Sequence, residues 1–191
     1  MGKVIAGMTM SLDGFINDAS GSAEKLSPDF PELLETPSFK EMIKNTGAVI
    51  MGRHTYEMAD PFLWINDDYE FQVPIFVLTH TPPAKYPRGN DKLTLTFVTD
   101  GVESAISLAR KAAGDKIVQI IGGASTIQQC LNSGSCDELW IDIMPVLLGK
   151  GLRLFENIDT DKMKLERTKI EETTQMRTSI IFRVRKTTPG V

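Results

Sequence analysis

Two mostly apolar runs of this sequence each end in glycine at the point where a helix is predicted to begin. The first, residues 48–51, is followed by Gly52, and the second, residues 116–121, by Gly122 and Gly123. A short apolar run is typical of a strand that is buried on both faces, as in a parallel sheet covered by helices. Two such strand-to-helix junctions predict an α/β fold that binds its ligands at the carboxyl ends of the strands.

The same alternation continues along most of the chain. Further strands are expected over residues 3–10, 74–79, 95–98 and 138–146. Residues 162–172 and 176–186 instead predict an antiparallel hairpin added at a sheet edge. The sequence thus predicts one α/β domain over residues 1–191, with a mostly parallel central sheet and antiparallel C-terminal strands.

Two helices have recognisable start signals. Thr36 precedes Pro37, a residue favoured at the first helical position, and Asp100 stands three residues before Glu103, as in a capping box. We therefore expect Thr36 and Asp100 to cap these helices with their side chains. The second helix is predicted to end at Gly114. Its buried face is predicted to carry Ala105, Ile106, Leu108, Ala109 and Ala112.

The glycine junctions offer groups that bind phosphate. The first N–H groups of a helix are unpaired and carry partial positive charge, and glycine lets an anion approach the backbone. Side chains that would add donors are Arg53, Thr55, Ser125 and Thr126. Two such junctions side by side would suit the pyrophosphate of a dinucleotide. The alternative is that the glycines only form tight turns, and neither the GxGxxG nor the P-loop pattern occurs in the chain.

Composition argues against several classes of function. The net charge of −4 disfavours binding to nucleic acid or to an anionic membrane. No stretch approaches the roughly 20 apolar residues that span a bilayer. Two cysteines and two histidines are too few for a disulfide framework or a metal site. We expect a cytoplasmic protein that acts on a small molecule, without a metal, a nucleic-acid partner or a membrane.

The segment around the first junction resembles the dihydrofolate reductases. Residues 49–57, VIMGRHTYE, are similar to the VxMGRxTxES segment of these enzymes, and residues 120–131 to their IGGGxxYxxxL segment. Residues 10–16, MSLDGFI, and 145–151, PVLLGKG, resemble a subgroup more closely: the reductase domain at the C-terminus of bifunctional riboflavin-biosynthesis proteins, and its stand-alone relatives. The chain differs in having Ala-Ser-Thr-Ile after the paired glycines, where dihydrofolate reductases carry a tyrosine near the nicotinamide.

This resemblance implies a three-layer dihydrofolate reductase-like fold that binds NADPH across the strand ends. The enzyme would transfer a hydride to a pteridine, a riboflavin precursor or a carbonyl compound, and the paired glycines would be joined by a cis peptide bond. The resemblance also suggests a homodimer built from the C-terminal strands. The implied cofactor contacts are Ala6, Leu12, Ile16, Gly52, Arg53, His54, Thr55, Leu78, Thr79, His80, Ile121, Gly122, Gly123, Ala124, Ser125, Thr126 and Ile127.

Reduction of a C=N or C=O bond also needs a proton, from a carboxyl group or from a water that it positions. Asp13 and Glu35 are the candidate donors. The family's folate-binding carboxylate belongs on the first helix, where we rank Glu35 ahead of Asp29 and Glu32. Asp13 could instead be a turn residue that binds its own backbone, and Glu35 a solvated charge at a helix end.

Two other functions stay open at this point: true dihydrofolate reduction, and a non-catalytic nucleotide-binding or regulatory module.

Two further residues have alternative roles. Cys130 lies on the apolar side of its helix and is expected in the core rather than as a nucleophile. Trp64 either roofs the substrate cleft or packs within a surface loop.

Overall fold

The computed structural model describes residues 2–87 and 89–187. Its centre is an eight-stranded sheet with the strand order β5-β4-β3-β6-β1-β7-β10-β9. From β5 to β7 all neighbouring strands are parallel, whereas β10 is antiparallel to β7 and β9 is antiparallel to β10. The strands are β1 (Val4–Ser11), β3 (Thr46–Gly52), β4 (Ile75–Leu78), β5 (Leu95–Val98), β6 (Ile117–Ile120), β7 (Glu138–Met144), β9 (Met163–Glu172) and β10 (Thr178–Lys186). The predicted α/β class, parallel sheet and C-terminal hairpin are confirmed.

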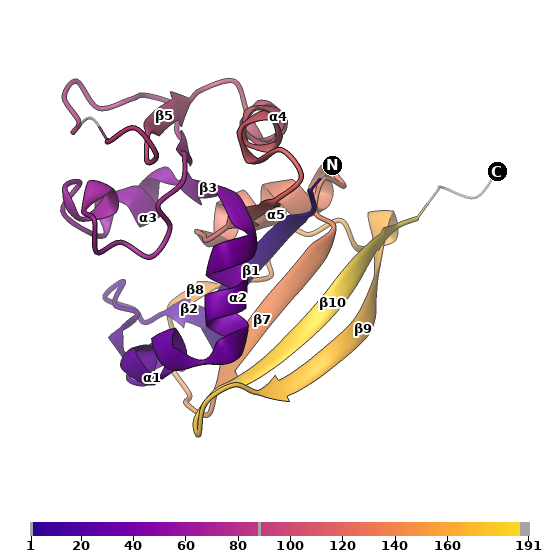
Figure 1. Ribbon diagram of the computed structural model, residues 1–191. Helices are drawn as coiled ribbons and strands as arrows, with labels where there is room; N and C mark the ends of the chain where they lie inside the picture. Colours follow the sequence, from indigo (N-terminus) through magenta and orange to yellow (C-terminus); the bar gives the residue numbers. More distant parts are fainter. Residues whose placement is uncertain (1, 88, 188–191) are drawn as a thin grey trace.

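Helices cover both faces of the sheet (Figure 1). α4 (Val102–Ala113) and α5 (Ala124–Asn132) pack on one face against the larger core cluster, which includes Ile50 of β3. α1 (Phe30–Glu35), α2 (Pro37–Asn45) and α3 (Arg53–Glu57) lie on the other face, where Val49 and Met51 belong to a second cluster. Since successive residues of β3 enter opposite clusters, the strand is buried on both sides, as predicted.

Short elements complete the chain. β2 (Phe15–Asn17) and β8 (Leu152–Arg153) form a small antiparallel sheet beside the carboxyl end of β1. Three single turns of 3₁₀ helix are η1 (Glu24–Leu26), η2 (Leu63–Ile65) and η3 (Thr160–Lys162). Among the described residues, no helix is long and apolar enough to cross a membrane.

The two predicted helix caps have different outcomes. Thr36 caps α2, because its side-chain oxygen accepts a hydrogen bond from the N–H of Phe39 at 3.3 Å. Asp100 does not cap α4, which begins after Gly101 without a side-chain hydrogen bond at that cap. The apolar stripe of α4 starts at Val102, so its spacing buries Val102, Ala105, Ile106, Ala109 and Ala113. Leu108 and Ala112 are exposed, and the predictions for Asp100, Leu108 and Ala112 were wrong.

Candidate active site

The two glycine junctions lie side by side at the carboxyl ends of β3 and β6. The N–H of Gly52 donates to the carbonyl oxygen of Gly122 at 2.8 Å. A Cβ atom on Gly52 would lie 2.6 Å from Oγ1 of Thr126, in the first turn of α5. Gly52 has an ordinary extended backbone, with φ of −80°. Glycine is therefore required there by the close approach of α5, not by turn geometry.

The second junction has a different reason for its glycine. Gly122 has φ of +122°, a conformation that residues with a side chain rarely adopt. A Cβ atom on Gly122 would also lie 2.8 Å from Cε of Met8 and 3.3 Å from Oγ1 of Thr55. The Gly122–Gly123 peptide bond is cis, as the resemblance implies. The junctions thus pack against each other and against Met8 of β1.

The predicted cofactor residues divide by exposure. Arg53, His54, His80, Ser125 and Leu12 are exposed, and Arg53 donates from Nε to Oε1 of Glu57 at 2.7 Å. Among the other predicted cofactor contacts, the side chains that are half-buried are Ile16, Thr55, Leu78 and Ile121.

Several of the predicted cofactor contacts have buried side chains. Ala6 and Ile127 are completely buried in the larger core cluster, and Ala124 and Thr126 are 2% and 3% exposed. The hydroxyl of Thr79 donates to the carbonyl oxygen of Thr81 at 3.0 Å. The side chains of these residues therefore serve the core or a turn, and only their backbones are available to a cofactor.

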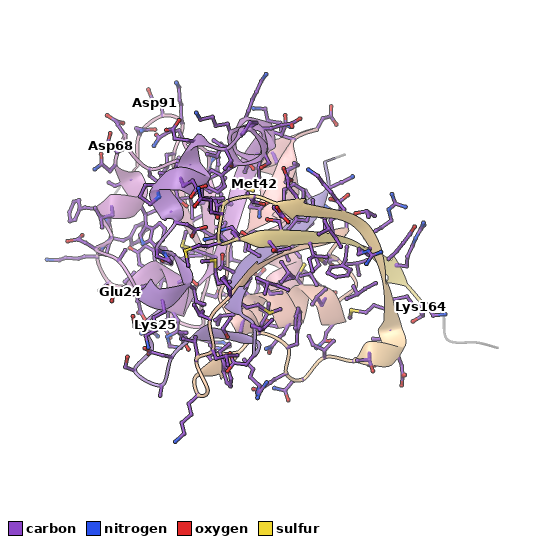
Figure 2. All side chains as sticks on the ribbon, turned by 90° about the horizontal axis from the view of Figure 1, so that it is seen from below. Glu24, Lys25, Met42, Asp68, Asp91 and Lys164 are labelled. Carbon is purple, nitrogen blue, oxygen red and sulfur yellow. The ribbon has the colours of Figure 1, made fainter. Side chains whose placement is uncertain are left out.

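A cavity of about 370 Å³ lies next to the junctions, between the sheet and the α1–α2 layer. Its walls are mainly apolar and include Phe30, Phe39 and Met42 from the helices. In Figure 2, Met42 lies within the outline of the molecule, whereas Asp68 and Asp91 lie at its edge. Of the predicted residues, Ile16 and Ile121 line this cavity.

A buried arginine forms the polar base of the cavity. The side chain of Arg177 is 1% exposed, and its Nε and Nη2 donate to the two carboxylate oxygens of Asp29 at 3.0 and 2.7 Å. Its Nη1 donates to Thr9 Oγ1 at 2.6 Å and to Asp142 Oδ2 at 3.0 Å. Ser179 donates to the other oxygen of Asp142 at 2.5 Å. We name Arg177, Asp29, Asp142, Thr9 and Ser179 the Arg177 cluster; it holds two carboxylates and one cation.

Within this cluster Asp29 is held in its ionised form. Burial raises the pKa of Asp29, but hydrogen bonds from Arg177 and Thr174 and the charge of Arg177 outweigh it and lower the pKa overall. Glu35, which we ranked ahead of Asp29, lies apart from this cluster. Glu35 is exposed, pairs with Lys40 at 2.6 Å, and does not line the cavity. The hydrogen bond from Lys40 lowers the pKa of Glu35 and so favours its ionised form.

Asp13 also has a structural role, and its partners extend beyond the turn that the sequence suggested. Its carboxylate accepts hydrogen bonds from the Ser11 hydroxyl at 2.6 Å and from the N–H groups of Leu148 and Gly149 at 3.1 and 2.7 Å. The Ser11 hydrogen bond, together with those from Gly149 and Leu148, lowers the pKa of Asp13 to about 2 against an opposing effect of burial. Asp13 therefore ties two loops together and is not supported as a proton donor.

The polar residues on the cavity floor were not among the site residues predicted from the sequence. Gln119 and Asp142 interrupt apolar strands, on the face opposite to the larger core cluster, and both line the cavity. Gln119 is 3% exposed, and its Oε1 has no hydrogen-bond partner among the described residues. A polar residue inside a buried strand is the signal that would have found both, because such a residue needs a partner or a ligand.

Two other candidates have structural roles. Trp64 donates from Nε1 to the carbonyl oxygen of Tyr56 at 2.8 Å, packs on Tyr69, and does not line the cavity. Cys130 is completely buried in the core, and a hydrogen bond with Cys136 and burial raise the pKa of its thiol. Within residues 2–87 and 89–187, no group of three or more His, Cys, Asp or Glu side chains is placed to hold a metal ion.

Replacing Arg177 is expected to destabilise the fold strongly. Arg177→Met leaves the Asp29 carboxylate buried without its cation, so the free energy of unfolding should fall by about 3–5 kcal/mol. Arg183→Met removes an exposed pair with Glu166 and should cost about 1 kcal/mol or less. Urea unfolding of both variants measures the difference, and Asp29→Leu added to Arg177→Met should restore part of the loss. Equal small losses for both arginines would contradict this role.

The loop contact of Asp13 predicts a pH dependence. Because its pKa is lowered from 3.8 to about 2 in the folded state, its stabilising contribution is complete above pH 3.8 and is lost as the pH falls through about 2. The difference in unfolding free energy between the wild type and Asp13→Asn should therefore be constant near neutral pH and shrink below about pH 4. Asp67→Asn, at an exposed carboxylate, serves as the control in the same urea titrations. A pH-independent difference for Asp13→Asn would contradict the assignment.

Comparisons with known proteins identify relatives of this chain. The family model described as RibD C-terminal domain matches residues 2–178. Protein YwjB of Bacillus subtilis (strain 168) is 27% identical over 171 residues, which cover 87% of this chain and 91% of YwjB. A structure from Shewanella sp. PV-4, described as a riboflavin biosynthesis protein, is 26% identical with a TM-score of 0.74, covering 96% of this chain and 99% of that one.

The wider fold is also identified. Dihydrofolate reductase from Enterococcus faecalis, solved in complex with NADP(H) and RAB-propyl, superposes with a TM-score of 0.59 at 15% identity. The match covers 96% of this chain and 97% of the reductase, so the dihydrofolate reductase-like fold is confirmed. Because the family model spans nearly all of the described residues, this chain belongs to the RibD C-terminal domain family.

Proposed function

We propose that this protein is an NADPH-dependent reductase that transfers a hydride to a small heterocycle bound in the cavity. The observation that carries this proposal is that the glycine junctions and the cavity share a wall. Ile121 lines the cavity and directly precedes Gly122, and Met8, also in the lining, faces Gly122. A cofactor with its diphosphate at the junctions therefore has its reactive end within reach of a substrate in the cavity.

The residues at the junctions fit a nicotinamide dinucleotide. The close contact of Gly52 with Gly122 brings the start of α5 beside the start of α3, so main-chain N–H groups and the exposed Ser125 hydroxyl are available to a diphosphate. Arg53 and His54 are exposed at the same edge and would contact further phosphate oxygens. Bound NADPH would supply the hydride, and the chain's own residues would orient it.

The charge of the Arg177 cluster affects the protonation of the acceptor that reduction requires. Asp13 and Glu35 are both engaged elsewhere by hydrogen bonds or ion pairs. The cluster has one more carboxylate than cations, and this excess negative charge at the cavity base would favour a protonated acceptor over an anionic one. We infer that the acceptor takes its proton from solvent, and that the cluster stabilises the protonated form.

The same cluster argues against dihydrofolate as the substrate. Of the acidic residues considered for folate binding, Asp29 is the one that pairs with Arg177, a residue of the cavity lining. Both of its oxygens accept from Arg177, and Oδ2 also accepts from Thr174. A carboxylate engaged in this way is poorly available to the donor groups of a pterin. We therefore favour a heterocycle that does not depend on Asp29.

The proposal is tested first by cofactor binding and turnover. NADPH should quench the protein's fluorescence saturably, and its absorbance should decay when a reducible pteridine or ribityl-pyrimidine is added. Little decay is expected with dihydrofolate. Saturable NADPH binding without turnover across the panel would support the non-catalytic module instead, whereas no saturable binding of NADPH or NADH would overturn the proposal.

Arg53 provides a sharper version of the binding test. If the guanidinium of Arg53 contacts the additional phosphate of NADPH, Arg53→Ala should weaken the binding of NADPH about tenfold or more. The binding of NADH should be weakened much less. Glu57→Gln, which removes the partner of Arg53 but keeps the guanidinium, should not weaken NADPH. Equal losses of both nucleotides in Arg53→Ala would contradict this role.

We also propose that the C-terminal hairpin forms a homodimer. Its outer strand β9 exposes Leu165 and Ile170, which are 48% and 53% exposed and pair in register with Val184 and Ile180. Ile180 and Val184 are four residues apart on β10 and project from the same face, and the register shift between the two pairs brings both partners on β9 to that face. These side chains therefore form an apolar strip along the β9–β10 ribbon, which extends past the helices in Figure 1. An exposed apolar edge of this kind is a site for association.

Sedimentation velocity tests the dimer. The wild type should sediment as a dimer, and the double substitution Leu165→Lys and Ile170→Lys should shift it to a monomer. Leu108→Lys alters an exposed leucine on α4, away from the ribbon, and should leave the dimer intact. A monomeric wild type, or a dimer that is unaffected by the double substitution, would overturn the proposal.

A further inference from the structure

Gln119 occupies an unusual position in the floor of the cavity. It lies on the central strand β6, flanked in register by Ile5 of β1 and Val49 of β3, and both of these residues are buried. Its carboxamide is accommodated because residue 7 is glycine: a Cβ atom on Gly7 would lie 2.6 Å from Nε2 of Gln119. The side chain thus lies across the neighbouring strand, and it lines the cavity next to Gly7.

The other polar groups of the floor already have partners within the protein. Thr9 and Asp142 accept hydrogen bonds from Arg177, and Ser179 donates to Asp142. Gln119 differs, because its Oε1 is buried and has no hydrogen-bond partner among the described residues. Leaving a buried carboxamide oxygen without a donor is costly, which indicates that a ligand supplies that donor.

The surroundings define the chemistry of this ligand. The cavity walls include the aromatic rings of Phe30, Phe39 and Trp140, which suit a flat ring system. The excess carboxylate of the Arg177 cluster disfavours an anion. A carboxamide offers an acceptor and a donor side by side, and its complement is a lactam edge, in which a ring N–H stands next to a carbonyl.

We propose that Oε1 of Gln119 accepts a hydrogen bond from the ring N–H of an uncharged lactam heterocycle in this cavity, and that Gln119 determines specificity for this class of substrate. This inference rests on the proposed function, which it refines. It assigns substrate recognition to the neutral carboxamide of Gln119 on the floor of the cavity, and not to the Asp29 carboxylate at the start of the first helix.

Lumazine, a fluorescent pteridine-dione, is a suitable probe because its ring N–H groups adjoin carbonyls. Wild-type protein should bind lumazine, measured by its fluorescence anisotropy, and should bind 1,3-dimethyllumazine, which lacks those N–H groups, about 10–100-fold more weakly. Gln119→Met keeps the length of the side chain but removes the acceptor. This substitution should weaken the binding of lumazine by a factor similar to the difference between the two probes. It should leave the weak binding of 1,3-dimethyllumazine nearly unchanged. Gln175→Met makes the same substitution at an exposed position that does not line the cavity, so this matched control should change the binding of neither probe.

The outcomes separate this inference from the proposed function. Equal binding of the two probes by the wild type, unchanged lumazine binding in Gln119→Met, or no lumazine binding at all would each overturn the role of Gln119. The comparison of the two probes on the wild type is decisive even if Gln119→Met fails to fold. NADPH titration of the same samples tests the reductase assignment independently, since Gln119 is not among the junction residues.

Discussion

The buried guanidinium of Arg177 is the interaction on which the geometry of the cavity depends. It joins the turn before β10 to Asp29 at the start of α1, to Asp142 of β7 and to Thr9 of β1. A buried cation is tolerated only when its donors are satisfied, and Arg177 achieves this with two carboxylates, a hydroxyl and the carbonyl oxygen of Leu26. A single side chain therefore links the first helix to the hairpin and to the centre of the sheet, which are themselves joined by the pairing of β10 with β7.

This constraint also shapes the chemistry that we propose. The resemblance places a folate-binding carboxylate on the first helix. In this protein the Asp29 carboxylate at the start of that helix is paired with Arg177 and forms a structural ion pair. Recognition of the substrate then falls to groups on the strands, and Gln119 is the floor residue whose acceptor is left for a ligand. The glycine junctions lie immediately beside it, where Gly52 and Gly122 contact each other through the backbone. Cofactor and substrate would thus meet at the carboxyl ends of β1, β3 and β6.

Local patterns predicted the elements well and the pairing of side chains poorly. The apolar run of β3 and the cap at Thr36 were confirmed, since each depends on neighbours within a few residues. Asp100 failed as a cap because Gly101 takes that position, and one residue of offset changes which side chain meets the helix. Asp13 and Glu35 were chosen as proton donors by residue type and position in the chain. The contacts that decide their chemistry, to Gly149 and Lys40, were not visible in that choice.

The sequence by itself determined the order of strands and helices, the two glycine junctions and, through its motifs, the resemblance to a reductase fold. These features are encoded in short windows, where apolar periodicity and backbone freedom act directly. Only the tertiary structure decided which carboxylates are engaged. Arg177 and Asp29 are 148 residues apart, and Asp13 and Gly149 are 136 apart. Whether a polar side chain is buried, paired or available to a ligand depends on strands brought together by folding, and no local pattern records that.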